Sequence, residues 1–143
     1  GATDTPLPGN TGRAFMSRFQ LTEAGTLNHV AVYSSVNSAG LIRGLVYADS
    51  AGSPGARVAV GAPVAVFQNA FAVSACSGQA LSPGWYWIGA ITEDYQSNVM
   101  CQSTGGTGWA QWGDSNYASP PNPWSGGGAA DYLVAAYAEY TTV

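Results

Sequence analysis

Hydrophobic and polar residues alternate with a period of two along most of the chain, and this alternation predicts β-strands. The clearest strand follows a turn in which Pro83 fixes φ and Gly84 can adopt positive φ. Residues 85–92 then read WYWIGAIT, which places Trp85 and Trp87 on one face and further bulky residues on the other. Because both faces are apolar, we expect a central, covered strand with both tryptophans in the core.

The same alternation recurs in runs that are separated by turns rich in Gly, Pro and Ser, and no helical periodicity extends beyond about two turns. The runs expected to form strands are residues 13–21, 26–36, 41–49, 57–60, 63–67, 70–76, 99–101 and 131–141. Short, regularly spaced strands without helices predict an all-β fold. We expect an antiparallel two-sheet β-sandwich of jelly-roll-like topology, with a β-barrel as the alternative.

A length of 143 residues predicts one domain. Residues 1–12 are rich in turn formers and predict an extended N-terminal arm, which is either a frayed terminus or an arm that lies on a neighbouring subunit. Residues 13–143 then form the β-sandwich domain, which carries a long, aromatic-rich loop at residues 102–130. Large aromatic residues are rare in disordered segments, so we expect this loop to pack or to bind a ligand.

Charge is scarce, because only 8% of the residues are charged, against roughly 25% in an average domain. Lysine is absent, and four scattered arginines with a net charge of −4 cannot form the basic stripe of a nucleic-acid interface. No apolar run approaches the roughly 18 residues of a membrane span, so we expect no membrane insertion. The first ten residues lack a signal-peptide pattern. This composition suits a virion surface or an extracellular location.

Enzymatic activity is not expected. The eight acidic residues fall mostly in turns or at strand ends, and the single histidine, His29, lies on an apolar face where it is expected to pack. No nucleophile elbow, phosphate-binding loop or zinc pattern occurs, so neither cofactor nor metal is expected. The Asp- and Gly-rich turn at residues 49–55 lacks the alternating ligands of a calcium loop, and Asp49 is expected to accept hydrogen bonds within its own turn.

The long loop supplies the candidate ligand-binding residues. Aromatic faces stack on the C–H faces of sugar rings, while carboxylates and amides bind the hydroxyl groups. The candidate glycan-binding residues are Trp109, Trp112, Tyr117, Trp124, Asp114 and Asn116. In the alternative interpretation, these aromatic residues form a small core that caps the sandwich.

The two cysteines, Cys76 and Cys101, leave two alternatives open. A disulfide between them would tie two strand ends together and contribute about 3 to 4 kcal/mol in the chain-entropy model. Two buried free thiols are the other alternative, because a chain that assembles in the cytoplasm keeps its cysteines reduced.

Two motifs resemble a known group of domains. The turn Y-x-D-x-x-G-x-P-G is met by Tyr47, Asp49, Gly52, Pro54 and Gly55, and the strand L-x-x-G-x-Y-W by Leu81, Gly84, Tyr86 and Trp87. With the tyrosine-rich last strand DYLVAAYAEY, residues 13–141 resemble jelly-roll domains of phage virion surface proteins, such as capsid decorations, head fibres and tail appendages, and of bacterial extracellular carbohydrate-binding modules. Such domains are typically non-catalytic.

The resemblance and the composition together lead to a functional expectation. We expect a structural, surface-display protein of a phage virion exterior, with a contribution to the attachment of a host-surface glycan. Its expected partners are further copies of itself, with a trimer favoured, and a capsid or tail protein. The alternative is a secreted bacterial carbohydrate-binding or adhesion module.

Overall fold

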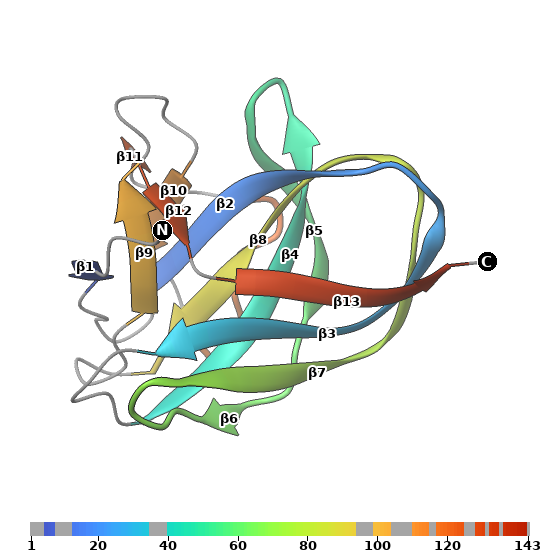
Figure 1. Cartoon of the computed structure of the whole chain (residues 1–143). Coiled ribbons are helices and arrows are strands. Elements are labelled where there is room, and N and C mark those ends of the chain that lie inside the picture. Colours follow the sequence, from blue (N-terminus) through green and yellow to red (C-terminus); the bar gives the residue numbers. More distant parts are fainter. Residues whose placement is uncertain are drawn as a thin grey trace.

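The computed structural model describes residues 5–7, 13–34, 40–93, 99–103, 110–114, 117–124, 128–130, 132–134 and 136–142. Its strands form two sheets, and every pairing between strands is antiparallel (Figure 1). The expected antiparallel two-sheet β-sandwich is therefore confirmed, while its jelly-roll-like connectivity stays a prediction.

The first sheet, which we call the β3 sheet, is built around β3 and its long antiparallel ladder with β7, which contains a register shift between Leu27 and His29. Its strands are β1 (Thr5–Leu7), β3 (Gly25–Ser34), β7 (Ala70–Leu81), β9 (Val99–Ser103), β12 (Tyr132–Val134) and β13 (Ala136–Thr142). β3 pairs with β7 on one side and with β13 on the other. β9 joins the end of β3 and pairs with β1 and β12.

The second sheet, which we call the β8 sheet, runs in the order β11, β10, β2, β8, β4, β5. Its strands are β2 (Arg13–Leu21), β4 (Leu41–Ser50), β5 (Ser53–Val60), β6 (Val64–Ala65), β8 (Gly84–Thr92), β10 (Ala110–Asp114) and β11 (Gly128–Ala130), with β6 paired to β4. β8 lies between β2 and β4 and pairs with both along its length. The central position that its two apolar faces predicted is thus confirmed.

The main core lies between the two sheets. It takes one set of alternating residues from each strand, which explains why the period-two pattern is so regular. Its buried members are Phe15, Leu21, Leu27, Val30, Val32, Ile42, Val46, Val66, Ala72, Leu81, Tyr86, Ile88 and Ala90. The other set of alternating residues of β2, β4 and β8 forms a second buried cluster, on the outer face of the β8 sheet, from Ala14, Met16, Leu45, Tyr47, Trp87 and Ile91.

The two tryptophans of β8 have different environments, although both were expected in the core. Trp87 is 1% exposed within the outer cluster, as expected. Trp85 is 37% exposed, so the expectation was wrong there. It shares a face with Trp87 but lies at the end of the strand, where the guanidinium carbon of Arg18 lies 4.3 Å from the centre of its ring.

One buried serine links the sheets. The hydroxyl group of Ser74, on β7, accepts a hydrogen bond of 2.8 Å from the backbone N–H of Gly44, on β4, and donates one of 2.7 Å to the carbonyl of Ala62. The sheets approach closely here, because a Cβ atom on Gly44 would lie 2.7 Å from the Cβ atom of Val30. A side chain larger than hydrogen at position 44 would therefore push the sheets apart.

The ends of the chain contain more strand than the sequence suggested. Residues 5–7 of the expected N-terminal arm form β1, which pairs with β9 of the same chain. The long segment at residues 102–130 contains β10, which pairs with β2, and β11, which pairs with β10. The last expected strand is divided into β12 and β13.

Candidate functional site

Residues 117–124 of the predicted glycan-binding loop form a surface segment that we call the strap. It includes Tyr117 and Trp124, both half-buried. Trp109 and Asn116 lie outside the described residues. For Trp112 and Asp114 the structure describes the backbone, in β10, and not the side chains.

The strap lies over the outer face of the β8 sheet, where Tyr117 and Trp124 pack against the second buried cluster. The rings of Tyr47 and Trp124 meet edge to face, with centres 5.4 Å apart and planes at 74°. Burial, with a contribution from Glu93, raises the pKa of Tyr117, although the charge of Arg43 lowers it. Because Tyr117 and Trp124 pack against the second buried cluster, their rings cover apolar surface. This is the arrangement expected if the aromatic residues of the loop form a small core that caps the sandwich.

Side chains of β4 donate hydrogen bonds to three backbone carbonyls of the strap. Arg43 donates from Nη1 to the carbonyl oxygens of Tyr117, at 3.2 Å, and Ala118, at 3.0 Å. The hydroxyl group of Tyr47 donates a 2.6 Å hydrogen bond to the carbonyl of Pro121. Burial raises the pKa of Tyr47 to about 12, although the positive charge of Arg57 lowers it. The phenol is therefore a neutral hydrogen-bond donor across the physiological pH range.

Strand β5 forms three further hydrogen bonds with the strap. Arg57 donates from Nη1 to the carbonyl of Pro120, and its backbone N–H donates to Oδ1 of Asn122 at 3.0 Å. The backbone N–H of Trp124 donates to the carbonyl of Gly55 at 2.9 Å. Backbone carbonyls in an irregular segment need hydrogen-bond donors when they are shielded from water. The side chains of Arg43, Tyr47 and Arg57 supply these donors to the strap.

The Asp49 carboxylate lies where the β4–β5 turn meets β8. The indole Nε1 of Trp87 donates to Oδ1 at 2.9 Å, and Nη2 of Arg18 donates to Oδ2 at 3.2 Å. The backbone N–H of Gly52, which has a φ of 88°, donates to Oδ2 at 3.3 Å. Partial burial alone would raise the pKa of Asp49, but these hydrogen bonds and the charge of Arg18 outweigh it and hold the pKa below its ordinary value. The expected structural role of Asp49 in its own turn is confirmed.

The outer face of the β3 sheet carries a group of mostly aromatic and apolar side chains, of which the sequence pattern singled out only His29. They lie in three rows across β7, β3 and β13. The rows are Phe71 and Tyr33; Val73, Ala31 and Tyr137; and Ala75, His29 and Glu139. We call these eight residues the aromatic face.

The rings of the aromatic face close over its centre. Phe71, on β7, and Tyr137, on β13, have ring centres 5.2 Å apart, although β3 lies between their strands. Tyr33 packs on Phe71 at 5.2 Å, and His29 on Tyr137 at 6.0 Å. Ala31, between them on β3, is fully buried although it points outward. Its small side chain leaves the space in which the flanking rings meet.

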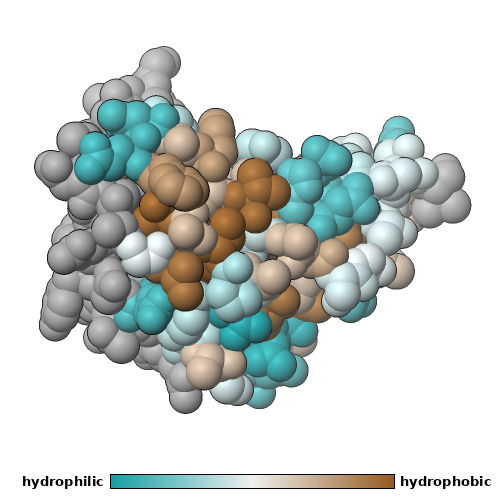
Figure 2. Space-filling view, turned by 90° about the horizontal axis from the view of Figure 1, so that it is seen from below, coloured by the Kyte–Doolittle hydropathy of each residue, from teal (hydrophilic) through white to brown (hydrophobic). Residues whose placement is uncertain are grey.

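Much of the aromatic face is exposed to solvent. Phe71 is 48% exposed, Val73 45% and Tyr137 43%. Phe67, in the segment that leads into β7, is 68% exposed. Figure 2 views the molecule from the side on which β6 and β7 lie, and it shows apolar residues gathered in the middle of that side between hydrophilic groups. Exposed apolar surface of this kind commonly marks an interaction site.

His29 lies at one end of the aromatic face. Its Nε2 atom is 3.5 Å from a carboxylate oxygen of Glu139, and its side chain is 21% exposed. It packs against the ring of Tyr137, so the expectation of a packed histidine is confirmed. The period-two pattern of β7 contained this face, but alternation alone does not say which face of a sheet is covered by the rest of the protein.

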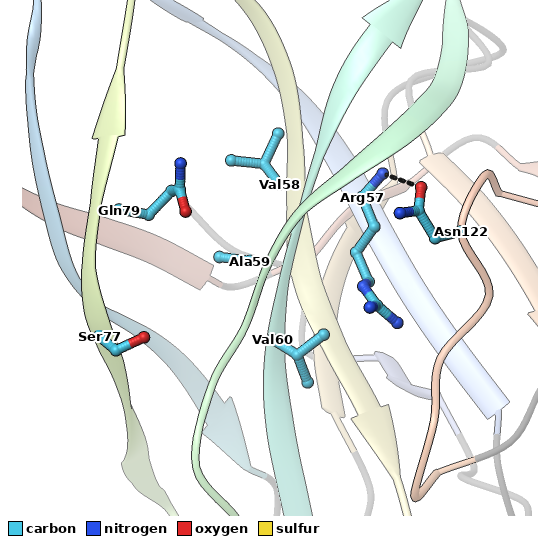
Figure 3. Close-up of a pocket in the computed structure, with 7 residues that line it drawn as sticks. All are labelled: Arg57, Val58, Ala59, Val60, Ser77, Gln79 and Asn122. Atoms are coloured by element: carbon cyan, nitrogen blue, oxygen red, sulfur yellow. Dashed lines mark hydrogen bonds between the residues drawn. The ribbon is translucent and has the colours of Figure 1, made fainter.

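A small hollow opens along β5, with a volume of about 250 Å³. It is bordered by β7 on one side and by the strap on the other (Figure 3). Its lining residues are Arg57, Val58, Ala59, Val60, Ser77, Gln79 and Asn122. We call this feature the β5 groove.

The cysteine alternatives are decided by strand geometry. Cys76 is a half-buried free thiol, and burial raises its pKa. Its neighbour Ala75 pairs with His29, whereas β9, which contains Cys101, joins β3 at Ser34. Ser34 pairs with β7 on one side and with β9 on the other, so two strand spacings, about 9 to 10 Å, separate the strands that carry the two cysteines. A disulfide needs Cα atoms within about 7 Å, so the Cys76–Cys101 bond is not formed.

The described residues contain no group of three or more His, Cys, Asp and Glu side chains that could hold a metal ion. No helix in the described ranges is long and apolar enough to cross a membrane. Comparisons of the chain with models of protein families, with curated proteins and with solved structures found no match.

Proposed function

We propose that this chain is a non-catalytic structural and surface-display protein of a phage virion exterior, of the capsid-decoration, fibre or tail-appendage type. In this proposal it assembles with further copies of itself through the aromatic face and contributes to the attachment of a host-surface glycan. The single observation that supports assembly is the exposed cluster of rings on β7, β3 and β13. The virion setting rests on the resemblance of the turn and strand motifs.

The geometry of the rings favours a protein partner over a sugar at the aromatic face. A sugar stacks on rings that lie flat on the surface and nearly in one plane. Here the planes of Phe71 and Tyr33 cross at 78°, and those of Phe71 and Tyr137 at 66°. Crossed rings leave ridges and gaps that the side chains of another protein fill, as at the centres of protein interfaces.

A second copy of this chain is the partner that fits the charges best. The middle of the face, around Val73 and Ala31, is uncharged, while the imidazole of His29 and the carboxylate of Glu139 lie together at one end. A symmetric contact can bring the carboxylate of one copy near the imidazole of another, without leaving a charge buried alone. We expect a closed assembly, such as a trimer.

Light scattering at several protein concentrations tests this proposal. The wild-type chain is expected at a multiple of its mass of 14.7 kDa. Val73→Asp places a charge in the middle of the aromatic face, so its mass is expected near that of one chain. Gln20→Asp, which adds the same charge on an exposed position of β2, is the matched control and should assemble like the wild type.

Thermal unfolding of each variant separates assembly from folding. If Val73→Asp melts at a much lower temperature than Gln20→Asp, Tyr137→Ser replaces it, because position 137 is also exposed and accepts a polar side chain without introducing a charge. A wild-type chain that is monomeric at every concentration contradicts assembly through this face.

The second candidate function is a secreted carbohydrate-binding or adhesion module that acts as a monomer. The observation that favours it is the β5 groove, where a guanidinium, two amides and a hydroxyl group line one hollow. A monomeric mass together with sugar binding in that groove would support this candidate over the virion component.

A further inference from the structure

The β5 groove contains a cation whose charge no described acid neutralises. Arg18 forms an ion pair with Asp49, and Arg43 donates to three backbone carbonyls. Arg57 donates from Nη1 to the carbonyl of Pro120, and among the described residues its guanidinium forms no ion pair with a carboxylate. A half-buried guanidinium at the edge of a hollow can bind an anion through charge-assisted hydrogen bonds.

The other polar groups of the groove suit a polyhydroxylated ligand. Ser77 and Gln79 reach it from β7, and Asn122 reaches it from the strap, on the other side of β5 (Figure 3). Amides and hydroxyl groups both donate and accept hydrogen bonds, as sugar hydroxyls do. Val58 and Val60 add apolar surface for the C–H groups of a sugar ring.

The groove is also small and partly preorganised. Its volume of about 250 Å³ lies below the roughly 300 to 1,000 Å³ of sites for drug-sized ligands, so it suits one sugar ring. The bonds from Arg57 to Pro120 and Asn122 fix the position of the arginine before a ligand arrives.

We propose that the β5 groove binds a single sugar unit that carries a carboxylate, such as a uronic acid, at the end of a host-surface glycan. The carboxylate lies against the guanidinium of Arg57, and the ring hydroxyls bind Gln79, Ser77 and Asn122. This inference rests on the glycan-attachment part of the proposed function and is independent of assembly through the aromatic face.

Titration of the ¹⁵N-labelled full chain, followed by amide chemical shifts, tests the site. Three probes are used. Glucuronate has both the sugar ring and the carboxylate, glucose has the ring without the carboxylate, and acetate has the carboxylate without the ring. We expect glucuronate to shift the amide signals of residues 57–60 and 77–79. Glucose and acetate are each expected to bind about tenfold more weakly, because each lacks one set of bonds.

Variants assign the contacts. Gln79→Ala, at an exposed position of β7, is expected to weaken glucuronate binding about tenfold, the effect of losing one or two hydrogen bonds. Gln20→Ala removes the same side chain from an exposed position of β2 and should bind like the wild type. Arg57→Lys keeps the charge but loses the two-pronged geometry, and it should also weaken binding.

Each contrary result overturns a stated part of the proposal. No shift with glucuronate overturns the site, and equal affinity for glucose overturns the role of the carboxylate. Equal affinity for acetate overturns the sugar, because the site would then bind any carboxylate. These results are distinguishable from a failure of assembly, because Val73→Asp leaves the groove unchanged and can be titrated as a monomer.

Discussion

The indole N–H of Trp87 donates a 2.9 Å hydrogen bond to the Asp49 carboxylate, and this bond joins the two motifs on which the sequence resemblance rests. Trp87 belongs to the strand motif and Asp49 to the turn motif. The same carboxylate lies 3.2 Å from Nε of Arg18 and is 13% exposed. A partly buried carboxylate with several donors orders three strands, β2, β4 and β8, at one end of the sheet.

Replacing Asp49 with Asn should make the protein less stable at neutral pH, by about 1 to 2 kcal/mol, because the charge-assisted bonds are lost while the size is kept. The pKa of Asp49 is lowered in the folded state, so the carboxylate form favours folding. Its contribution is complete above about pH 4 and disappears as the pH falls through the folded-state pKa. Urea unfolding of both proteins at pH 7 and near pH 2 measures this.

The expected result is a gap between wild type and Asp49→Asn that is present at pH 7 and closes in acid. Glu23→Gln, an exposed acid in the β2–β3 turn, is the control and should show little effect at either pH. A gap of the same size in acid would show that the carboxylate charge has no part in the effect.

The second prediction concerns the packing of the strap on the outer cluster. Trp124→Ala exposes the outer cluster around Tyr47 and should lower the free energy of unfolding by about 2 kcal/mol, less than for a fully buried tryptophan because this one is half-buried. Phe67→Ala, at a position that is 68% exposed, should change it by less than about 0.5 kcal/mol. If both variants unfold at the same urea concentration as the wild type, Trp124 does not stabilise the outer cluster. Its ring would then be available to bind a ligand.

Two buried serines differ in their hydrogen bonds and give a matched pair. Ser74 bonds to the backbone of both Gly44 and Ala62, so Ser74→Ala leaves two buried groups unsatisfied and should cost about 2 to 3 kcal/mol. The hydroxyl group of Ser34 is buried and has no partner among the described residues. Ser34→Ala should therefore be neutral or slightly stabilising. Equal urea midpoints for the two variants would contradict a special role for Ser74 between the sheets.

The phenol of Tyr47 should titrate in alkali. Because burial raises its pKa to about 12 in the folded state, its neutral form favours folding. This contribution is fully present below about pH 10 and is lost as the pH rises through the folded-state value. Ultraviolet absorbance should show tyrosine ionisation near pH 12 that is missing in Tyr47→Phe. The free energy of unfolding of that variant should also be about 1 kcal/mol lower, because it lacks the hydrogen bond to the carbonyl of Pro121. If Tyr47→Phe and the wild type titrate alike, Tyr47 is not the tyrosine that ionises near pH 12.

The composition of the long loop predicts glycan binding, but composition cannot distinguish a ligand-binding loop from one that packs on the sheet. Tryptophans next to amides and carboxylates look the same in a sequence whether they face solvent or cover a sheet. Tyr117 and Trp124 pack against the outer cluster of β2, β4 and β8, whose residues are far away in the chain. The three donors that hold the strap, on Arg43, Tyr47 and Arg57, carry no local signal of that role.

The alternation of side chains was enough to predict the class of fold and the positions of most strands, because alternation is a local property and each strand of a sandwich has one face toward the core. The sequence also located the Asp49 turn, since the residues that form a turn are neighbours in the chain. Which outer face is covered and which is open became clear from the fold alone. The strap packs against the outer cluster that contains Trp87, while Trp85 is 37% exposed and Phe71, Val73 and Tyr137 remain uncovered. Whether an outer face of a sheet is covered depends on contacts between segments that are distant in the chain. A period of two in the sequence carries no information about those contacts.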